Sequence, residues 1–327
     1  MEKRKLGASS TEASVVTFGA WAIGGWMWGG ADRKDALDAI RAAYDHGVTS
    51  IDTAPAYGQG LSEEIVGEAI RGIDRDKIQV FTKFGLRWDT NQGEFFFKSR
   101  DNAGKDLLMH KLASEESIIK ECEASLKRLR TGYIDLYQIH WPDSTTPIAE
   151  TMGALRRLLE QGKIKAAGVC NYTVHQMEEA EKSIFLVSNQ VPYSMVYRNI
   201  EKDVIPYAIK HHKAILAYSP LQRGLLTGKI RPGHKFNPGD TRAGSEFYKQ
   251  DFIIKVNAFL KRLRSLADQK HATVSQLVIR WTIEQPGITI ALVGARNSMQ
   301  AIENAGAGDI HLSKEELNFI SQELKKV

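Results

Sequence analysis

Short apolar runs and amphipathic stretches alternate along most of this chain. Eight runs, rich in β-branched, aromatic and aliphatic residues, have the length of buried strands: residues 14–18, 49–53, 78–83, 133–140, 165–171, 187–191, 214–218 and 289–294. Between them, apolar residues recur at helical spacing in residues 33–46, 62–71, 114–130, 147–161, 174–182, 203–211 and 273–284. Strands that alternate with helices in this way predict parallel strands joined by right-handed crossovers.

Eight strand-helix units in 327 residues favour an α/β fold of the (β/α)8 TIM-barrel type, with long βα loops at its C-terminal face. We expect one domain over residues 1–327, and an amphipathic helix at residues 314–325 that packs outside the barrel. An open, doubly wound sheet remains an alternative, because periodicity alone does not show closure.

Two segments depart from the alternation. Residues 84–113 lack a clear core pattern but carry Trp88 and the run Phe95-Phe96-Phe97, so we expect a long loop that acts as a substrate lid, with a mobile connector as the alternative. Residues 222–250 are rich in Gly, Pro and Arg and could close over an extended ligand.

Composition and charge exclude several classes of protein. Lys and Arg number 44 against 39 Asp and Glu, and the net charge of +5 is spread without a basic run, so no nucleic-acid partner is expected. The two cysteines have no metal-ligand spacing and do not suggest a secreted disulfide scaffold. The cysteine spacing also indicates no metal site. Because no segment resembles a signal peptide or a membrane span, we expect a cytoplasmic protein without a membrane partner.

Candidate chemistry gathers where the predicted strands end. Asp52 and Tyr57 follow the second strand, Lys83 ends the third, and His140 ends the fourth. A lysine ammonium beside a phenol lowers the phenol pKa, a carboxylate keeps that lysine charged, and an imidazole can orient a substrate oxygen. Taken singly these are ordinary polar residues. Together, at the C-terminal face of a barrel, they predict a proton-transfer site.

Familiar nucleotide motifs fit the chain poorly. Residues 224–229 (GLLTGK) are one residue short of a P-loop, and residues 21–26 lack the Gly-x-Gly-x-x-Gly order. His175, His211 and His212 have no second ligand at zinc-like spacing. A dinucleotide site must therefore be built in another way.

Several ordered segments carry a resemblance to a known family. They are residues 18–21 (FGAW), 52–58 (DTAPAYG), 134–142 (IDLYQIHWP), 168–171 (GVCN), 218–229 (YSPLQRGLLTGK) and 294–297 (GARN). Over nearly its whole length the chain resembles an aldo-keto reductase of the bacterial general-stress or inositol-operon type. The resemblance implies a barrel that binds NADPH without a Rossmann motif.

The resemblance also implies roles for individual residues. Tyr57 matches the proton donor, Lys83 and Asp52 its activating pair, and His140 the residue that orients the carbonyl. The implied cofactor-binding residues are Ala20, Trp21, Asp52, Asn171, Gln190, Tyr218, Ser219, Leu221, Arg223, Gly294, Arg296, Gln300, Glu303 and Asn304. Cys170 stands where the family normally has serine, and a thiol is a weaker donor. Arg296 would supply the charge for a 2'-phosphate.

The resemblance also implies an apolar substrate pocket, because several tryptophans match or flank the family's pocket positions, although they could instead be core residues. These are Trp21, Trp28, Trp88 and Trp141. The expected function is NADPH-dependent reduction of small aldehydes and ketones, or oxidation of the corresponding alcohols or sugars. The alternative is a nucleotide-sensing interaction protein with slow catalysis, similar to potassium-channel β subunits. The sequence does not determine the native substrate, the reaction direction or the oligomeric state, although a monomer is favoured.

Overall fold

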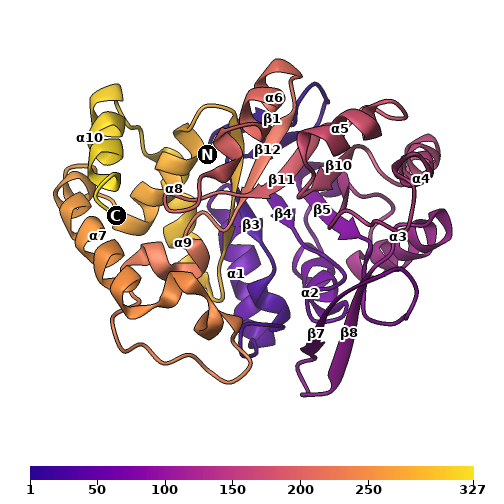
Figure 1. The fold of residues 1–327 in the computed structure, drawn as a ribbon, viewed down its shortest axis with the longest axis horizontal. Helices are drawn as coiled ribbons and strands as arrows, with labels where there is room; N and C mark the ends of the chain where they lie inside the picture. The colour runs from indigo at the N-terminus through magenta and orange to yellow at the C-terminus, as the bar shows by residue number, and fades with distance from the viewer.

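A closed barrel of eight parallel strands forms the centre of the computed structural model, which describes residues 1–327 (Figure 1). Around the barrel the order is β3, β4, β5, β9, β10, β11, β12 and β13, and β13 pairs with β3 to close it. The strands are β3 (Val16–Gly19), β4 (Ser50–Asp52), β5 (Gln79–Phe84), β9 (Leu136–Ile139), β10 (Ala167–Cys170), β11 (Ser188–Pro192), β12 (Ala214–Tyr218) and β13 (Ile288–Gly294). The predicted (β/α)8 barrel is confirmed, and the open sheet is excluded.

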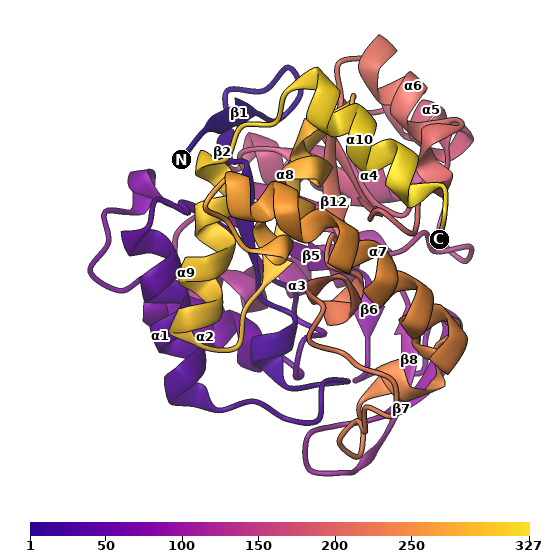
Figure 2. The same ribbon diagram turned by 90° about the vertical axis from the view of Figure 1, so that its left-hand side faces the viewer.

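Helices surround the barrel and bury one face against it (Figures 1 and 2). They are α1 (Arg33–Asp45), α2 (Leu61–Ala69), α3 (Glu115–Leu129), α4 (Ile148–Glu160), α5 (Val174–Glu181), α6 (Val204–Lys210), α8 (Val274–Glu284) and α9 (Ser298–Gly306). Short 3-10 turns are η1 (Ala22–Gly24), η2 (Arg75–Lys77), η3 (Asn199–Glu201), η4 (Gln222–Thr227), η5 (Thr241–Gly244), η6 (Glu246–Tyr248) and η7 (Ala307–Asp309). None of the helices is long and apolar enough to cross a membrane.

Two further helices lie side by side outside the barrel (Figure 2). α10 (Lys314–Leu324) packs against α7 (Gln250–Gln269), and Arg262 of α7 pairs with Glu323 of α10. The outer position of α10 was predicted. Helix α7 was not predicted, although Ile253, Val256 and Leu260 recur at helical spacing along its buried face.

The inside of the barrel is apolar at its N-terminal end. A hairpin of β1 (Lys3–Lys5) and β2 (Glu12–Ser14) lies there, and its Leu6 and Ala13 join a cluster with Leu136 and Leu216 of the barrel strands. Gly7, with φ of +57°, approaches the backbone at Val187, so no side chain fits at that position. This plug leaves the C-terminal end of the strands as the face available for a site.

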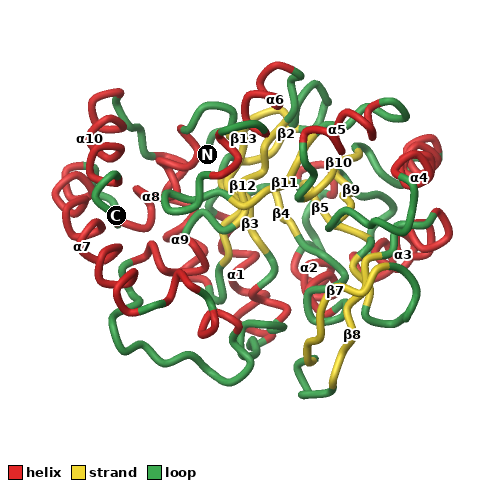
Figure 3. The backbone as a smooth tube through the Cα atoms, viewed as in Figure 1, coloured by secondary structure: helices red, strands yellow, loops and turns green.

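The segment expected to be a loop, residues 84–113, is an ordered small sheet that projects from the barrel (Figure 3). Strands β6 (Leu86–Arg87), β7 (Glu94–Arg100) and β8 (Asp106–Lys111) pair antiparallel in the order β6-β8-β7. The loop prediction was wrong. The side chains alternate between buried and exposed positions, as in a strand: Leu107 and Met109 are buried, whereas Leu108 is exposed.

The projecting sheet is tied to the loop that follows β3. Trp26 donates its indole N–H to Ser99 Oγ over 3.0 Å, and the Asn102 amide donates to the Gly24 carbonyl over 2.8 Å. Because both bonds link elements that flank the same face of the barrel, the sheet forms a fixed wall there.

Candidate active site

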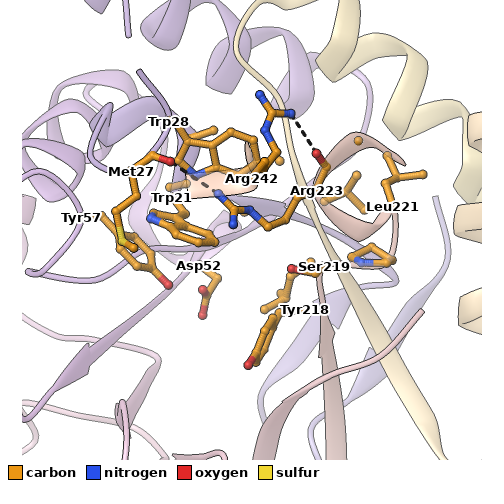
Figure 4. A pocket seen from close by; sticks show the side chains of 18 of the residues that line it. Trp21, Met27, Trp28, Asp52, Tyr57, Tyr218, Ser219, Leu221, Arg223 and Arg242 are labelled. Carbon is orange, nitrogen blue, oxygen red and sulfur yellow. Dashed lines mark hydrogen bonds between the residues drawn. The ribbon is translucent and has the colours of Figure 1, made fainter. Parts of the chain in front are cut away.

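A cavity of about 580 Å³ opens at the C-terminal ends of the barrel strands, where TIM barrels carry their chemistry (Figure 4). The residues that line it come from the loops after β3 and β4, from the ends of β9 to β13, from the segment after β12, from the projecting sheet and from α9. A volume of this size suits a small molecule or part of a larger cofactor.

A buried ion pair lies at the base of this cavity. Lys83 on β5 donates from Nζ to Asp52 Oδ1 over 2.5 Å and to the Thr53 carbonyl over 2.9 Å. Both side chains are almost fully buried. Burial disfavours the ammonium, but the Asp52 carboxylate, together with Tyr57 and Cys170, outweighs burial and raises the pKa of Lys83, so the lysine stays charged.

Tyr57 lies beside this pair, in the turn after β4. Lys83 Nζ is 5.1 Å from the centroid of the tyrosine ring, and Trp21 stacks on that ring at 6.1 Å between centroids. Burial raises the pKa of Tyr57 to about 12, while the charge of Lys83 acts in the opposite direction. Lys83 therefore lowers the phenol pKa as expected, but in this state the effect of burial is larger, and Tyr57 carries its proton at neutral pH.

His140 faces Tyr57 from the end of β9. The two rings meet edge to face with centroids 5.6 Å apart. Burial, together with the nearby charge of Lys83, lowers the pKa of His140 well below its usual range, so the imidazole is neutral at physiological pH. A neutral imidazole and a protonated phenol can both donate a hydrogen bond to one small acceptor placed between them.

A layer of amides lies beside these rings. Asn171, at φ of +60°, accepts from the Tyr218 hydroxyl over 3.0 Å and donates to the His140 carbonyl over 3.1 Å. Gln190 donates to Asp52 Oδ2 over 2.7 Å. Cys170 is buried, and burial raises the pKa of its thiol, so it remains protonated beside Asn171.

One end of the cavity is cationic. The lining there includes Arg223, Lys229, Arg242 and Arg296. Lys229 pairs with Glu303 and Arg242 pairs with Asp240, whereas Arg223 and Arg296 have no carboxylate partner. Arg296 donates to the Gly30 carbonyl over 2.7 Å and immediately precedes α9, whose positive N-terminal end also favours anions.

Two arginines stack with tryptophans over this end of the cavity (Figure 4). The Arg223 guanidinium lies 5.0 Å from the ring centroids of both Trp21 and Trp28, and the Arg242 guanidinium lies 4.8 Å from that of Trp28. Arg242 also donates to the Arg223 carbonyl over 2.9 Å. The Nε atom of Arg223 is buried without a hydrogen-bond partner, so this guanidinium keeps a free donor for a ligand.

The wall next to Tyr57 and His140 is apolar. Phe96 and Phe97 of β7 join Trp26 and Trp141 there, and Phe96 contacts Trp141 with ring centroids 5.2 Å apart. A carbonyl compound held at Tyr57 would therefore have its substituent against aromatic side chains.

Comparison with known proteins identifies the chain. The model of the aldo/keto reductase family matches residues 15–324. The chain belongs to this family. It is 41% identical over 302 residues to the aldo-keto reductase YhdN of Bacillus subtilis, covering 92% of this chain and 86% of that protein. It is 36% identical over 318 residues to the NADH-specific methylglyoxal reductase of Escherichia coli, covering 96% and 95%.

Solved structures of aldo-keto reductases resemble the fold of this chain. The glycerol dehydrogenase AKR11B4 of Gluconobacter oxydans has a TM-score of 0.88 at 38% identity, over 99% of this chain and 95% of that one. An aldo-keto reductase of Klebsiella pneumoniae, solved in complex with NADPH, has a TM-score of 0.72 at 29% identity, over 98% and 95%.

The structure of this aldo-keto reductase gathers nearly all the residues singled out from sequence. Asp52, Tyr57 and His140 line the cavity, and Lys83 lies directly behind Asp52. The cavity is also lined by every residue predicted to bind cofactor, namely Ala20, Trp21, Asp52, Asn171, Gln190, Tyr218, Ser219, Leu221, Arg223, Gly294, Arg296, Gln300, Glu303 and Asn304.

The predicted substrate pocket needs one correction. Trp21, Trp28 and Trp141 line the cavity, but Trp88 does not. Trp88 packs instead against a small apolar cluster formed by the projecting sheet and its support, which includes Leu86 and Met109. Because Trp88 closely follows the third predicted strand, it was predicted to line the pocket. In the structure it packs behind the residues that do so.

Some lining residues had not been singled out as site residues. Phe96 and Phe97 lay in the supposed lid, and Arg242, Lys229 and His234 lay in the segment 222–250. That segment does reach across the cavity: Arg223 Nη2 donates to the Met27 carbonyl over 3.4 Å. The aromatic triplet and the density of arginines were signals in sequence, but only the folded chain shows which of these side chains turn inward.

The residues present fit a nicotinamide dinucleotide, the class of cofactor that aldo-keto reductases use. The indole N–H groups of Trp21 and Trp28 and the Nε of Arg223 are buried beside the cavity without partners, so polar atoms remain available there. The cationic end suits phosphates, and the amides of Asn171 and Gln190 lie next to the ion pair.

Proposed function

We propose that this protein is an NADPH-dependent carbonyl reductase that acts, as one domain, on small aldehydes and more slowly on ketones. The observation that carries the proposal is the meeting of a protonated phenol, a neutral imidazole and a buried Lys83–Asp52 pair in one cavity that is aromatic on one side and cationic on the other. The family and the NADPH complex of the Klebsiella pneumoniae relative support it.

The cofactor would occupy the cavity from the amides to the cationic end. Asn171 and Gln190 would take the carboxamide and Tyr218 would stack on the ring. Ser219, Leu221 and Arg223 would meet the pyrophosphate, and Arg296, Gln300, Glu303 and Asn304 the adenosine end. When bound, the reduced nicotinamide supplies hydride to the carbonyl carbon. We propose NADPH because Arg296 offers a charge for the 2'-phosphate, although the Escherichia coli relative is NADH-specific.

Tyr57 would donate its proton to the carbonyl oxygen as negative charge grows there. His140, being neutral, can donate one ring N–H to the same oxygen and fix its orientation. Lys83 would stabilise the phenolate left behind, and Asp52 keeps the lysine charged and aimed. These donors act mainly on the transition state, so their loss should appear in turnover more than in binding.

Reduction needs a protonated Tyr57, and this condition is met near neutral pH. A phenol with a pKa of about 12 is protonated there and can act as the acid. Alcohol oxidation needs the phenolate as a base, so the oxidation rate should rise as the pH increases towards that pKa.

The test is a panel of aromatic and aliphatic aldehydes, ketones and sugars, assayed with NADPH and with NADP+ by nicotinamide absorbance. We expect NADPH oxidation with activated aldehydes first and ketones second. If NADPH binds but no substrate of the panel consumes it beyond a single slow turnover, the enzyme proposal fails and a nucleotide-sensing role replaces it.

A further inference from the structure

A glutamine inside the barrel, Gln138, directs its side-chain amide at the Asp52 carboxylate. Gln138, on β9, is fully buried, and its Nε2 lies 3.4 Å from Asp52 Oδ2. Gln190 donates to the same oxygen over 2.7 Å from β11. Two amides from two different strands therefore converge on one carboxylate oxygen, and the other oxygen is held by Lys83.

The barrel makes room for this second amide. Gly168 stands on β10, the strand between β9 and β11, and a Cβ there would lie 3.2 Å from Gln138 Cγ and would collide with Ser188 Oγ. A larger residue at position 168 would first displace Ser188 and would also press on the Gln138 side chain, which would have to shift by a few tenths of an ångström. The absence of a side chain at Gly168 thus allows Gln138 to reach across the barrel interior.

Gln138 keeps this place at an energetic cost. Its Oε1 is buried without a hydrogen-bond partner, as is the Oγ of neighbouring Ser188. An unsatisfied buried acceptor typically costs about 1 to 3 kcal/mol, whereas a leucine would fill an apolar barrel without that cost. Packing therefore does not explain an amide here, and its contact with Asp52 does.

The two amides differ in their access to the cavity. Gln190 lines the cavity, where the proposed function has it bind the cofactor carboxamide, whereas Gln138 does not line the cavity. Where the ligand draws the Gln190 amide away from Asp52, Oδ2 loses its shorter hydrogen bond. A buried carboxylate oxygen without a donor is unfavourable, so a replacement is needed.

We propose that Gln138 is a positioning residue, which takes over as the donor to Asp52 Oδ2 when Gln190 is engaged by ligand. It thereby keeps the carboxylate aligned on Lys83 during the reaction. This inference rests on the proposed function, because it needs a ligand that draws Gln190 away from Asp52.

A double-mutant cycle on NADPH affinity tests the exchange without measuring turnover. The four proteins are wild type, Gln138→Met, Gln190→Met and the double variant, and binding is followed by quenching of tryptophan fluorescence, since Trp21 and Trp28 line the cavity. In the presence of Gln190, losing Gln138 should weaken NADPH binding by about tenfold, the lower end for a hydrogen bond to a charged group. In the Gln190→Met background no exchange takes place, so the same substitution should change affinity by less than about twofold.

Controls separate positioning from a structural role. Ser188→Ala removes the neighbouring unpaired hydroxyl and should leave NADPH affinity unchanged. Thermal unfolding verifies that each variant folds, and Gln138→Leu removes the amide with a different shape and should reproduce the pattern. Equal losses of affinity in both backgrounds, or no loss in either, would overturn the positioning role alone. If wild-type protein binds no NADPH, both the proposed function and this inference are wrong.

Discussion

Replacing Lys83 by methionine disturbs both roles of the buried ion pair: it removes the charge that acts on Tyr57, and it leaves Asp52 without a counter-ion. Lys83 Nζ lies 5.1 Å from the Tyr57 ring centroid, and at an effective dielectric constant of about 20 a unit charge at that distance is worth about 3 kcal/mol, or about two pKa units. Losing it should weaken the acid and lower turnover by roughly tenfold to a hundredfold. It also leaves Asp52 unpaired and buried, which costs about 3 to 5 kcal/mol of stability.

The double variant Lys83→Met/Asp52→Asn distinguishes these effects. A neutral amide at position 52 no longer needs a cation and can still accept from Gln190, so the stability measured by urea unfolding should return to within about 1 kcal/mol of wild type. Turnover, measured by NADPH oxidation with one aromatic aldehyde, should stay low. A double variant that is stable and also turns over at a near wild-type rate would refute the electrostatic role of Lys83.

Three further predictions concern the cofactor, the substrate wall and pH. Arg296→Ala should weaken NADPH binding by about tenfold to a hundredfold and NADH binding little, measured by fluorescence titration; equal losses would make Arg296 structural. Phe96→Ala should raise KM for aromatic aldehydes by about tenfold but leave acetaldehyde nearly unchanged, with the exposed Phe95→Ala as control. Burial raises the pKa of Glu121 to about 7 from 4.5. The folded state then binds this proton more tightly than the unfolded chain, so stability should fall as pH rises from about 5 to 7, and Glu121→Gln should flatten that slope in thermal unfolding.

The sequence was enough to predict the barrel and the centre of the site for one physical reason. Once eight parallel strands close, all their C-terminal ends meet on one face, so Asp52, Lys83 and His140, which end or follow three strands, must converge. Tyr57 follows β4 closely enough to be placed with them. Strand and helix periods over 5 to 15 residues carried that prediction.

Other features depended on tertiary packing. The alternation in β7 and β8 is short and has exposed apolar residues, such as Phe95 and Leu108, on its open face, so its period was masked. Trp88 packs against the cluster of Leu86 and Met109, which come together only when β6 pairs with β8. The net pKa of Tyr57 depends on how much burial offsets Lys83, and spacing along the chain holds no information about that balance.

The most direct test of the central claim is the single-turnover rate of Tyr57→Phe, with NADPH affinity measured on the same preparation. The substitution keeps the ring that stacks on Trp21 and removes only the acidic proton. We predict an NADPH dissociation constant within about twofold of wild type and a rate of NADPH oxidation lower by about a hundredfold or more on every carbonyl substrate tried. A variant that binds NADPH normally and reduces several carbonyl compounds at close to the wild-type rate would show that Tyr57 is not the proton donor.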